Sequence, residues 1–204
     1  MNQHSSSEKI PKTRRGRETR EKLLQAAEIE FGERGFHEAA ISGITQRAGV
    51  ALGTFYVYFN SKEEIFRALV TYMSHLTRTW IYERVAESPD RLAAEREGVK
   101  AFVEFVRQHK NLYRIVSEAQ FVAEDAYRDY YTTFANSYRE NLQLAADNSE
   151  IRGGDFDVWA WALIGMNVFV GMRFAAWEDA QSADDIAESI TDLIGNGMLG
   201  SKGS

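Results

Sequence analysis

The sequence predicts an all-α fold, and three observations lead to that prediction. The chain has only two prolines in 204 residues, whereas the helix-favouring residues Ala, Leu, Glu and Arg are common. Apolar residues recur with the helical period in almost every segment. Neither strand-like alternation nor an internal repeat is visible, so we expect helices to form the whole core.

The bulk composition limits the setting in which the protein works. There is no cysteine, which excludes disulfides and cysteine metal sites and fits a reducing cytoplasm. Residues 1–20 are polar and charged, so no secretory signal is visible and a cytoplasmic protein is expected.

The charge is unevenly distributed along the chain. The net charge is −6, but residues 1–62 hold ten Lys or Arg against seven Asp or Glu, whereas residues 63–204 hold fourteen against twenty-three. A basic first third on an acidic body indicates a head that binds a polyanion.

The N-terminal region is expected to hold a tail and one helix. Residues 1–12 are polar and serine-rich, and we expect them to be disordered. The basic run at residues 12–17 is either a solvated tail or an arm against phosphate. A first helix is predicted over Thr19–Arg34, with Gly35 as its C-terminal cap.

The next segment has the pattern of a helix-turn-helix. A short helix is predicted over Ile41–Ala48 and a second over Ala51–Phe59. Gly49 between them can adopt the positive φ that a tight turn demands. Ile44 and Phe55 can fill the angle between the two helices. Such a pair of helices is a common DNA-binding motif.

A long fourth helix is predicted to start at Ser61 and to run towards Glu87. Ser61 and Glu64 have the spacing of a capping box. Lys62 lies in the first turn, where the helix dipole disfavours a cation. We therefore expect Lys62 to bind an outside anion such as a phosphate.

The remainder of the chain predicts a helical body. Its predicted helices are Arg91–Gln108, Leu112–Ala119, Glu124–Ala146, Asp155–Asp179 and Ala183–Gly195. Within the fourth of these, the apolar run at residues 158–172 is shorter than the roughly 20 residues of a membrane span. We expect a helix buried on all sides and no membrane partner.

Residues 17–66 resemble the TetR family of bacterial transcriptional regulators. The matching positions are Leu24, Ala27, Phe31, Gly35, Phe36, Ile44, Ala48, Gly49, Val50, Gly53, Thr54, Phe55, Tyr56, Tyr58, Phe59, Ser61, Lys62 and Glu63. The chain departs from the family at Ala39 and Ala40, where Thr or Ser is usual, and at Thr45, where Ala is usual. Ser42 is the candidate to replace the lost phosphate contact.

The resemblance implies an Ω-shaped homodimer. Each subunit would carry a three-helix DNA-binding head at residues 13–66 and an effector-binding and dimerisation body at residues 67–198, followed by a flexible tail at 199–204. The implied partners are double-stranded operator DNA, expected to be palindromic, and a small effector. Effector binding would shift the fourth helix and release the operator. No cofactor and no metal is implied.

The family positions also imply which residues meet DNA. The expected DNA-binding residues are Arg14, Arg15, Arg17, Ser42, Arg47, Leu52, Gly53, Thr54, Tyr56, Tyr58 and Lys62. For Tyr56 and Tyr58, packing within the head is the alternative. The recognition helix has no Arg or Asn for bidentate base contacts, so specificity is expected from methyl contacts and from Arg47 or the basic arm.

Aromatic residues of the body are candidates to line an effector pocket, although core packing is the alternative for each. The expected pocket residues are Phe121, Tyr127, Tyr131, Phe134, Tyr138, Trp159 and Asn167. Asn167 lies in an apolar helix and needs a partner, which is a neighbouring helix, the dimer mate or a ligand. Little charge is visible here, so a small apolar or aromatic effector is expected.

The last two helices are expected to form the dimer interface, because the apolar helix has two faces to bury. The expected interface residues are Trp161, Gly165, Val168, Met172, Ile186, Ile190, Leu193 and Ile194.

These observations favour a ligand-responsive repressor. A DNA-binding protein without an effector is the alternative. An enzyme is a rival class, but the four His are scattered, and no nucleophile motif or Gly-rich phosphate loop is visible. No enzymatic activity is therefore expected.

Overall fold

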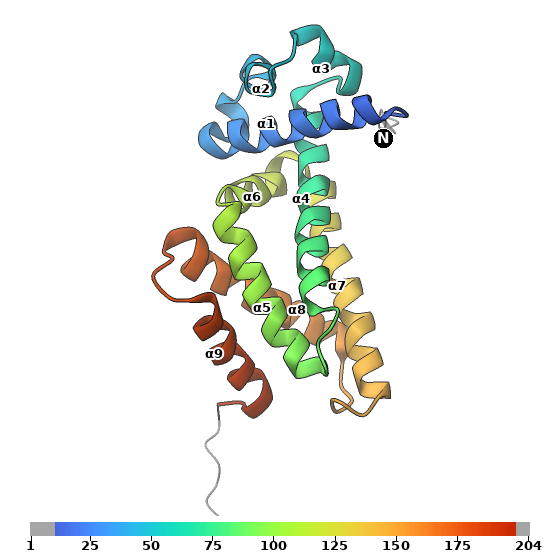
Figure 1. Cartoon of the computed structure of the whole chain (residues 1–204), viewed down its shortest axis with the longest axis vertical. Coiled ribbons are helices and arrows are strands. Elements are labelled where there is room, and N and C mark those ends of the chain that lie inside the picture. Colours follow the sequence, from blue (N-terminus) through green and yellow to red (C-terminus); the bar gives the residue numbers. More distant parts are fainter. Residues whose placement is uncertain (1–10, 199–204) are drawn as a thin grey trace, which may run out of the picture. The chain divides into compact units, whose positions relative to one another are not determined.

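A computed structural model describes residues 11–198 of the chain, and every regular element in that range is helical. In chain order (Figure 1) the elements are α1 (Arg14–Glu38), α2 (Ile41–Ala48), α3 (Leu52–Tyr58), α4 (Lys62–Val85), α5 (Arg91–Gln108), α6 (Leu112–Val122), α7 (Glu124–Asp147), α8 (Phe156–Gly171), the π-helical turn η1 (Met172–Trp177) and α9 (Ala183–Asn196). The all-α prediction is confirmed for these residues. Of the two predicted tails, residues 1–10 and 199–204 lie outside the described range.

The chain divides into two compact units. Within the described residues, the first unit comprises residues 11–72 and 114–128, and the second comprises residues 73–113 and 129–198. The division passes through α4 and α7, so each of these helices contributes to both units. The first unit extends past the predicted boundary at residue 66 to residue 72. It also includes most of α6.

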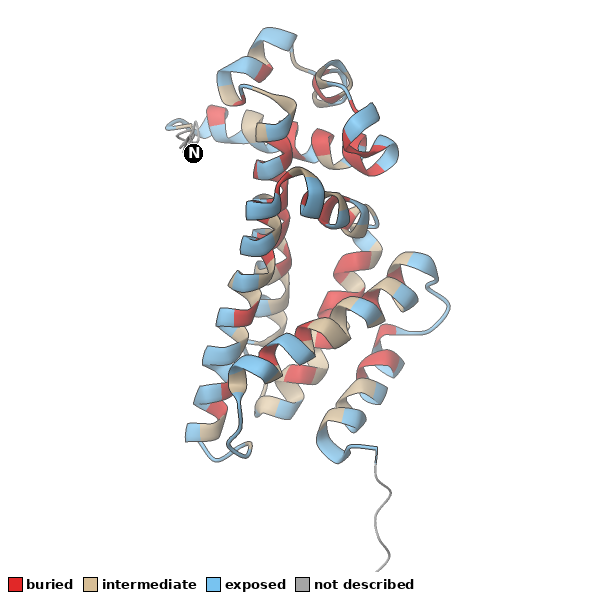
Figure 2. Cartoon of the chain, turned by 180° about the vertical axis from the view of Figure 1, so that it is seen from behind, coloured by how far each residue is buried: buried red, intermediate tan, exposed pale blue. Residues whose placement is uncertain are grey.

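The first unit is built on an apolar core from α1 to α4, and Figure 2 marks the buried positions in red. Its most deeply buried side chains are Leu23, Leu24, Ala27, Phe31, Ile44, Phe55, Phe59, Ile65 and Phe66. The Phe66 ring meets the rings of Phe31 and Phe36 with centroid separations of 5.0 and 5.1 Å. The predicted apolar face of the first helix is therefore confirmed.

Helix α1 begins at Arg14 rather than at Thr19. The hydroxyl of Thr13 accepts a hydrogen bond from the Gly16 N–H at 3.1 Å and so caps the helix. The basic run at residues 12–17 is thus mostly the first turn of a helix and not a tail, and its contact with phosphate stays a prediction.

Charged residues of α6 hold the end of α1. Arg114 donates through Nη1 to the carbonyls of Gly32 and Glu33 at 3.1 and 3.0 Å, and Glu118 accepts from the Phe36 N–H at 2.7 Å. Between them Gly35 has a φ of 77°, and a Cβ there would lie 2.6 Å from both side chains. A glycine is therefore required at this bend.

Glu30 is a buried carboxylate that joins α1 to α2. Its side chain accepts from Arg47 Nε at 2.9 Å and lies 3.2 Å from Arg34 Nε. It also accepts from the Ala40 N–H at 3.4 Å, just before α2 begins. A Cβ at Gly43 would lie 2.4 Å from Glu30 Oε1, so this glycine leaves room for the carboxylate.

In the second unit, α9 packs against α5. Lys100 Nζ and Arg96 Nη2 donate to Asp184 Oδ1 at 2.8 and 3.2 Å, and the hydrogen bond from Lys100 is the main cause of the lowered pKa of Asp184. Ile186 is buried within its own chain, which argues against its predicted place in a dimer interface.

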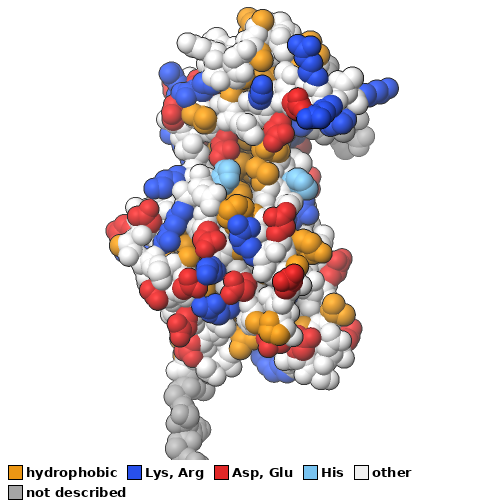
Figure 3. Space-filling view, in the orientation of Figure 1, with side chains coloured by type: hydrophobic (Ala, Val, Ile, Leu, Met, Phe, Trp, Pro, Cys, Tyr) orange, Lys and Arg blue, Asp and Glu red, His pale blue; other side chains and the backbone are white. Residues whose placement is uncertain are grey.

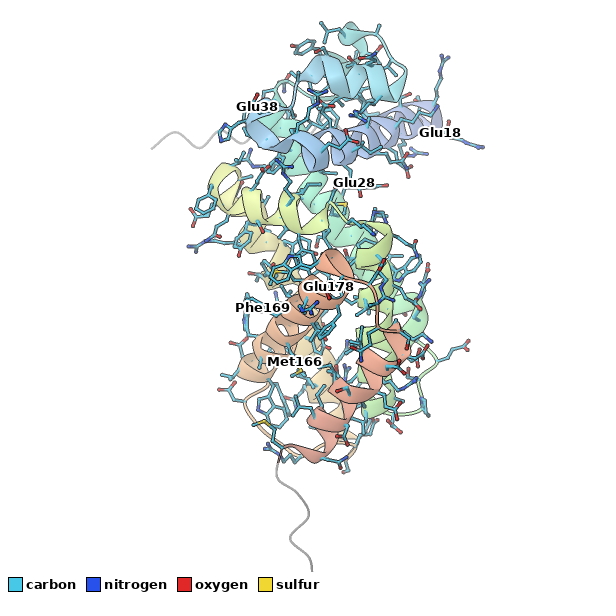
Figure 4. The ribbon with its side chains drawn as sticks, turned by 90° about the vertical axis from the view of Figure 1, so that its left-hand side faces the viewer. Glu18, Glu28, Glu38, Met166, Phe169 and Glu178 are labelled. Atoms are coloured by element: carbon cyan, nitrogen blue, oxygen red, sulfur yellow. The ribbon has the colours of Figure 1, made fainter. Side chains whose placement is uncertain are left out.

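Helix α8 is not buried on all sides within the single chain, and its burial by a second subunit stays a prediction. Its buried positions are Ala160, Ile164 and Gly171. Its most exposed apolar positions are Val158, Trp161 and Phe169, at 59%, 45% and 68% exposure. Figure 4 labels Met166 and Phe169 on this helix. By length and composition alone, the stretch Phe156–Trp177 could cross a membrane. Of its most apolar 18-residue segment, 22% is buried.

We predict that Glu30→Ala destabilises the protein by about 2 kcal/mol or more, because it leaves the partly buried Arg47 without its main partner and removes the acceptor for the Ala40 N–H. Urea denaturation measures the change. Glu33→Ala is the control, since Glu33 also pairs with Arg47 but is 55% exposed, and its effect should stay within about 0.5 kcal/mol. Equal effects of the two substitutions would contradict a structural role for Glu30.

Candidate nucleic-acid interface and ligand cavity

The turn between α2 and α3 has the geometry of a helix-turn-helix. Gly49 adopts a φ of 66° and a ψ of 33°, and its N–H donates to the carbonyls of Thr45 and Gln46. The Val50 N–H donates to the Thr45 carbonyl at 3.0 Å. The predicted left-handed glycine is confirmed. Thr45, the departure from the family pattern, is buried and donates its hydroxyl to the Ser42 carbonyl at 3.1 Å.

Helix α3 presents a mixed face to solvent. Leu52, Tyr56 and Val57 are 51%, 48% and 63% exposed, and Thr54 is half-buried. A Cβ at Gly53 would meet nothing within 4 Å. Because a glycine inside a helix costs stability and no neighbour in the chain requires this one, we interpret it as room for a partner. Val57 belongs to this face and was not among the predicted contacts.

The N-termini of α2 and α3 carry no side-chain cap. Ala40 and Ala51 occupy the two capping positions, and neither can accept a hydrogen bond through its side chain. The first-turn N–H groups therefore need outside acceptors, and the exposed hydroxyl of Ser42 lies in the first turn of α2. Phosphate oxygens are suitable acceptors for both.

The basic residues of the first unit divide into exposed and internally paired ones. Arg14, Arg15 and Arg17 are exposed on the first turn of α1, and Figure 3 shows Lys and Arg side chains prominent on the unit with α1 to α3. Arg14 pairs with Glu18 at 2.8 Å, and Arg17 donates to the Lys12 carbonyl at 3.0 Å. Such surface contacts are weak, so these side chains remain available to DNA.

Arg47 and Lys62 are engaged inside the protein. Arg47 bonds to Glu30 and Glu33, and the hydrogen bond from Glu30 is the main reason that its pKa is raised. Lys62 Nζ donates to the carbonyls of His37 and Ala39, both at 3.0 Å. Lys62 thus already has acceptors at the end of α1, which were not predicted from the sequence. Contact of either residue with DNA stays a prediction.

The two recognition-helix tyrosines differ in burial. Tyr56 is 48% exposed and meets the Phe55 ring edge to face at 5.3 Å between centroids. Tyr58 is half-buried, and its hydroxyl lies 3.7 Å from the position that a Cβ on Gly16 would occupy. Tyr58 therefore lies beside the first turn of α1, which supports packing within the head as its role.

The second unit contains a cavity of about 350 Å³ between α4, α5 and α7. Its lining residues are His75, Arg78, Thr79, Ile81, Tyr82 and Val85 from α4, Arg91, Ala94 and Gly98 from α5, and Phe134, Ser137, Tyr138 and Asn141 from α7. The volume lies at the lower end of the range of roughly 300–1,000 Å³ that ligand pockets occupy.

Two of the predicted pocket residues, Phe134 and Tyr138, line this cavity. The others, Phe121, Tyr127, Tyr131, Trp159 and Asn167, lie outside its lining. Phe121 is 85% exposed in the first unit, and the Trp159 ring packs against Phe156 at 5.5 Å between centroids.

A polar network adjoins the cavity. Glu95 is buried and accepts from Arg91 Nε at 2.9 Å and from the Tyr138 hydroxyl at 2.6 Å. Burial, and next the neighbouring Glu95 carboxylate, raise the pKa of Tyr138 well above its usual value, so its hydroxyl stays protonated and donates. Asn167 acts on the same hydroxyl and lowers its pKa, less than burial and Glu95 raise it. A neighbouring helix therefore offers Asn167 a polar partner, and its contact with a ligand stays a prediction.

The sequence interpretation missed Arg78, Arg91 and Glu95. The i, i+4 spacing of Arg91 and Glu95 was the only signal for their pairing. Among the described residues, no group of three or more His, Cys, Asp or Glu could hold a metal ion.

Similarity to known proteins agrees with this geometry. The family model described as bacterial regulatory proteins, tetR family, matches residues 23–69, which contain the helix-turn-helix. Residues 23–69 therefore have the sequence of a TetR-type DNA-binding domain. The uncharacterized HTH-type transcriptional regulator YdgC of Bacillus subtilis is 29% identical over 189 residues, which are 91% of this chain and 95% of that protein. The chain is accordingly a DNA-binding transcriptional regulator whose N-terminal domain matches the TetR family.

Two further similarities concern regulators with a stated action or ligand. The transcriptional activator FasR of Mycolicibacterium smegmatis is 31% identical over 107 residues, 52% of this chain and 49% of FasR. The solved structure of FadR from Bacillus subtilis in complex with stearoyl-CoA is 19% identical, covers 88% of this chain and 99% of FadR, and has a TM-score of 0.74. At that identity the likeness to FadR establishes the fold.

We predict that Gly53→Ala stabilises the protein by about 0.5–1 kcal/mol, because it removes a helical glycine at a position with open space. The same substitution should weaken operator binding about tenfold or more, since the added methyl group would stand between α3 and the groove. Thermal denaturation and fluorescence anisotropy measure the two effects.

Gly98→Ala is the matched control, because a Cβ at this position in α5 makes only an ordinary contact of 3.8 Å with Val85. It should give a similar gain in stability and leave operator affinity unchanged. Unchanged operator affinity for Gly53→Ala would contradict the assignment of this face to DNA.

Proposed function

We propose that this TetR-family protein is a homodimer that represses transcription from a palindromic operator in the bacterial cytoplasm, and that a small amphiphile in the cavity releases it. One observation carries the proposal. Of the three helices that line the cavity, α4 and α7 also contribute to the unit that holds the helix-turn-helix. We assign no catalytic activity to the chain.

The proposed DNA surface combines the exposed face of α3 with the first turns of α1 and α2. Leu52, Thr54 and Val57 supply apolar groups for thymine methyl contacts, and Gly53 permits close approach. The exposed arginines of α1 and the uncapped N–H groups of α2 supply the phosphate contacts, which hold the register without reading sequence.

The proposed dimer interface is the exposed stripe of α8 with the neighbouring face of α9. Trp161 and Phe169 are exposed on α8, and Leu193 is 38% exposed on α9. A Cβ at Gly165, on the same side of α8 as Trp161, would meet nothing within 4 Å of its own chain, which supports close approach of a second helix. A stripe of this kind is unfavourable in water and favours a partner subunit over a membrane, because α8 already packs on α5.

The proposed effector has an apolar body that fits against Ile81, Val85 and Phe134. FadR, which binds stearoyl-CoA, has the same fold, and this supports an acyl compound as the chemical class. Effector and operator compete only if the effector prefers the conformation that does not bind DNA. The coupling expected for such a switch is about 1–3 kcal/mol. A DNA-binding protein without an effector remains the alternative, and the cavity argues against it.

We predict that Gly98→Phe abolishes release by the effector and leaves operator affinity without effector within about threefold of the wild type. The first carbon of the new side chain fits, because a Cβ there lies 3.8 Å from Val85, and the ring then occupies the cavity. A gel-shift titration with the compounds that co-purify with the protein measures release. Gln108→Phe, at the exposed end of α5, is the control and should respond as the wild type does. Normal release from Gly98→Phe would place the effector elsewhere.

We predict that Phe169→Asp converts the dimer to monomers, because it puts a charge into an apolar interface. Sedimentation velocity at micromolar concentration measures the state of the chain. Leu144→Asp, at a 59% exposed position on α7, is the control and should stay dimeric. A wild-type chain that sediments as a monomer, or a dimeric Phe169→Asp variant, would refute this interface.

A further inference from the structure

The charged residues that line the cavity all have the same sign. They are Arg78 and Arg91, and no Asp or Glu is among the lining residues. The surrounding sequence is acidic, since residues 63–204 hold fourteen Lys or Arg against twenty-three Asp or Glu. The acidic composition of the body does not account for a cavity lined by cations, which points to a specific role for these arginines.

Arg91 already has partners. Its Nε donates to Glu95 at 2.9 Å, its guanidinium lies 5.4 Å from the centre of the Tyr138 ring, and its backbone N–H donates to Glu150 at 2.8 Å. The Tyr138 hydroxyl is likewise engaged, since it donates to Glu95 at 2.6 Å. These groups fix the frame of the cavity and leave little capacity for a ligand.

Arg78 differs from Arg91. Its Nε is buried and has no hydrogen-bond partner among the described residues. A buried, unpaired guanidinium N–H loses its hydration without compensation, so it destabilises the free protein. Groups that cost stability in this way are typical of sites that await a ligand.

The neighbours of Arg78 suit an amphiphile. Ser137 and Asn141 on α7 add a hydroxyl and an amide to the lining, whereas Ile81, Val85 and Phe134 supply apolar surface. An anionic head can therefore be bound through charge-assisted hydrogen bonds while its tail packs on the apolar residues.

We propose that the cavity binds an amphiphile with an anionic head, a carboxylate or a phosphate, and that Arg78 is the residue that binds this head. The inference rests on the proposed function and adds the charge of the effector to it. Arg78 lies on the second half of α4, and the first residues of α4 belong to the DNA-binding unit. An anion that binds Arg78 therefore contacts a helix that both units share. The anion contact is then the part of the effector that selects the released state.

The test uses the full-length dimer and three ligands with the same ten-carbon chain: decanoate, decanoyl-coenzyme A and 1-decanol. Isothermal titration calorimetry gives the affinity of each ligand for the wild type, for Arg78→Met and for Arg139→Met. Methionine keeps the length of the side chain and removes its charge. Arg139 is an exposed arginine on α7 outside the cavity, so its substitution controls for the change in net charge.

The expected result is that at least one of the two anions binds the wild type about tenfold or more tightly than 1-decanol, since charge-assisted hydrogen bonds contribute more than neutral ones. Arg78→Met should abolish this preference, and Arg139→Met should retain it. Preference for decanoate assigns the head as a carboxylate, and preference for decanoyl-coenzyme A alone assigns it as a phosphate.

Thermal denaturation without ligand separates this role from a structural one. Arg78→Met should melt at the same temperature as the wild type or higher, because it removes an unpaired buried group. A lower melting temperature, an undiminished preference for anions in Arg78→Met, or 1-decanol binding as tightly as both anions would overturn the inference. The proposed function fails separately, if the operator complex ignores every compound that binds in the cavity.

Discussion

The continuity of α4 is the constraint on which the rest of the structure depends. This helix runs for 24 residues without interruption, and the division between the two units falls within it. Its first half buries Ile65, Phe66 and Leu69 beside the helix-turn-helix, and its second half lines the cavity. Because a sharp kink disrupts the ladder of hydrogen bonds in a helix, we propose that a displacement of one half of α4 is carried to the other. Helix α7 shares this division, so the cavity is bounded by two elements that reach the DNA-binding unit.

The head shows that positive charge near a helix-turn-helix serves two purposes. Arg47 and Lys62 stabilise the head itself, one by pairing with the buried Glu30 and the other by bonding to carbonyls at the end of α1. The groups that we propose for DNA are the arginines of α1, the first-turn N–H groups and the open side of Gly53. Folding and recognition therefore draw on different residues of one small unit, and substitutions can separate them.

Local features of this fold could be predicted from the sequence, and distant contacts could not. The left-handed turn at Gly49 and the apolar face of α1 follow from short-range spacing and are confirmed. The role of Lys62 could not be predicted, because its acceptors lie more than twenty residues away. Periodicity placed Phe134 and Tyr138 on an inward face but gave no sign that Arg78 and Arg91 would join them. The apolar composition of α8 predicted that it must be covered, and the structure adds which positions its own chain leaves exposed, among them Trp161 and Phe169.

The central claim is that the cavity and the operator compete through one conformational equilibrium, and reciprocity of binding tests it most directly. Calorimetric titration of the tightest-binding member of the ten-carbon series, without operator and with saturating operator, gives the change in ligand affinity. Anisotropy titration of labelled operator, without and with that ligand, gives the change in DNA affinity. The account predicts that each weakens the other by the same factor, since coupling free energy is mutual. Ligand affinity that is the same with and without operator would contradict it.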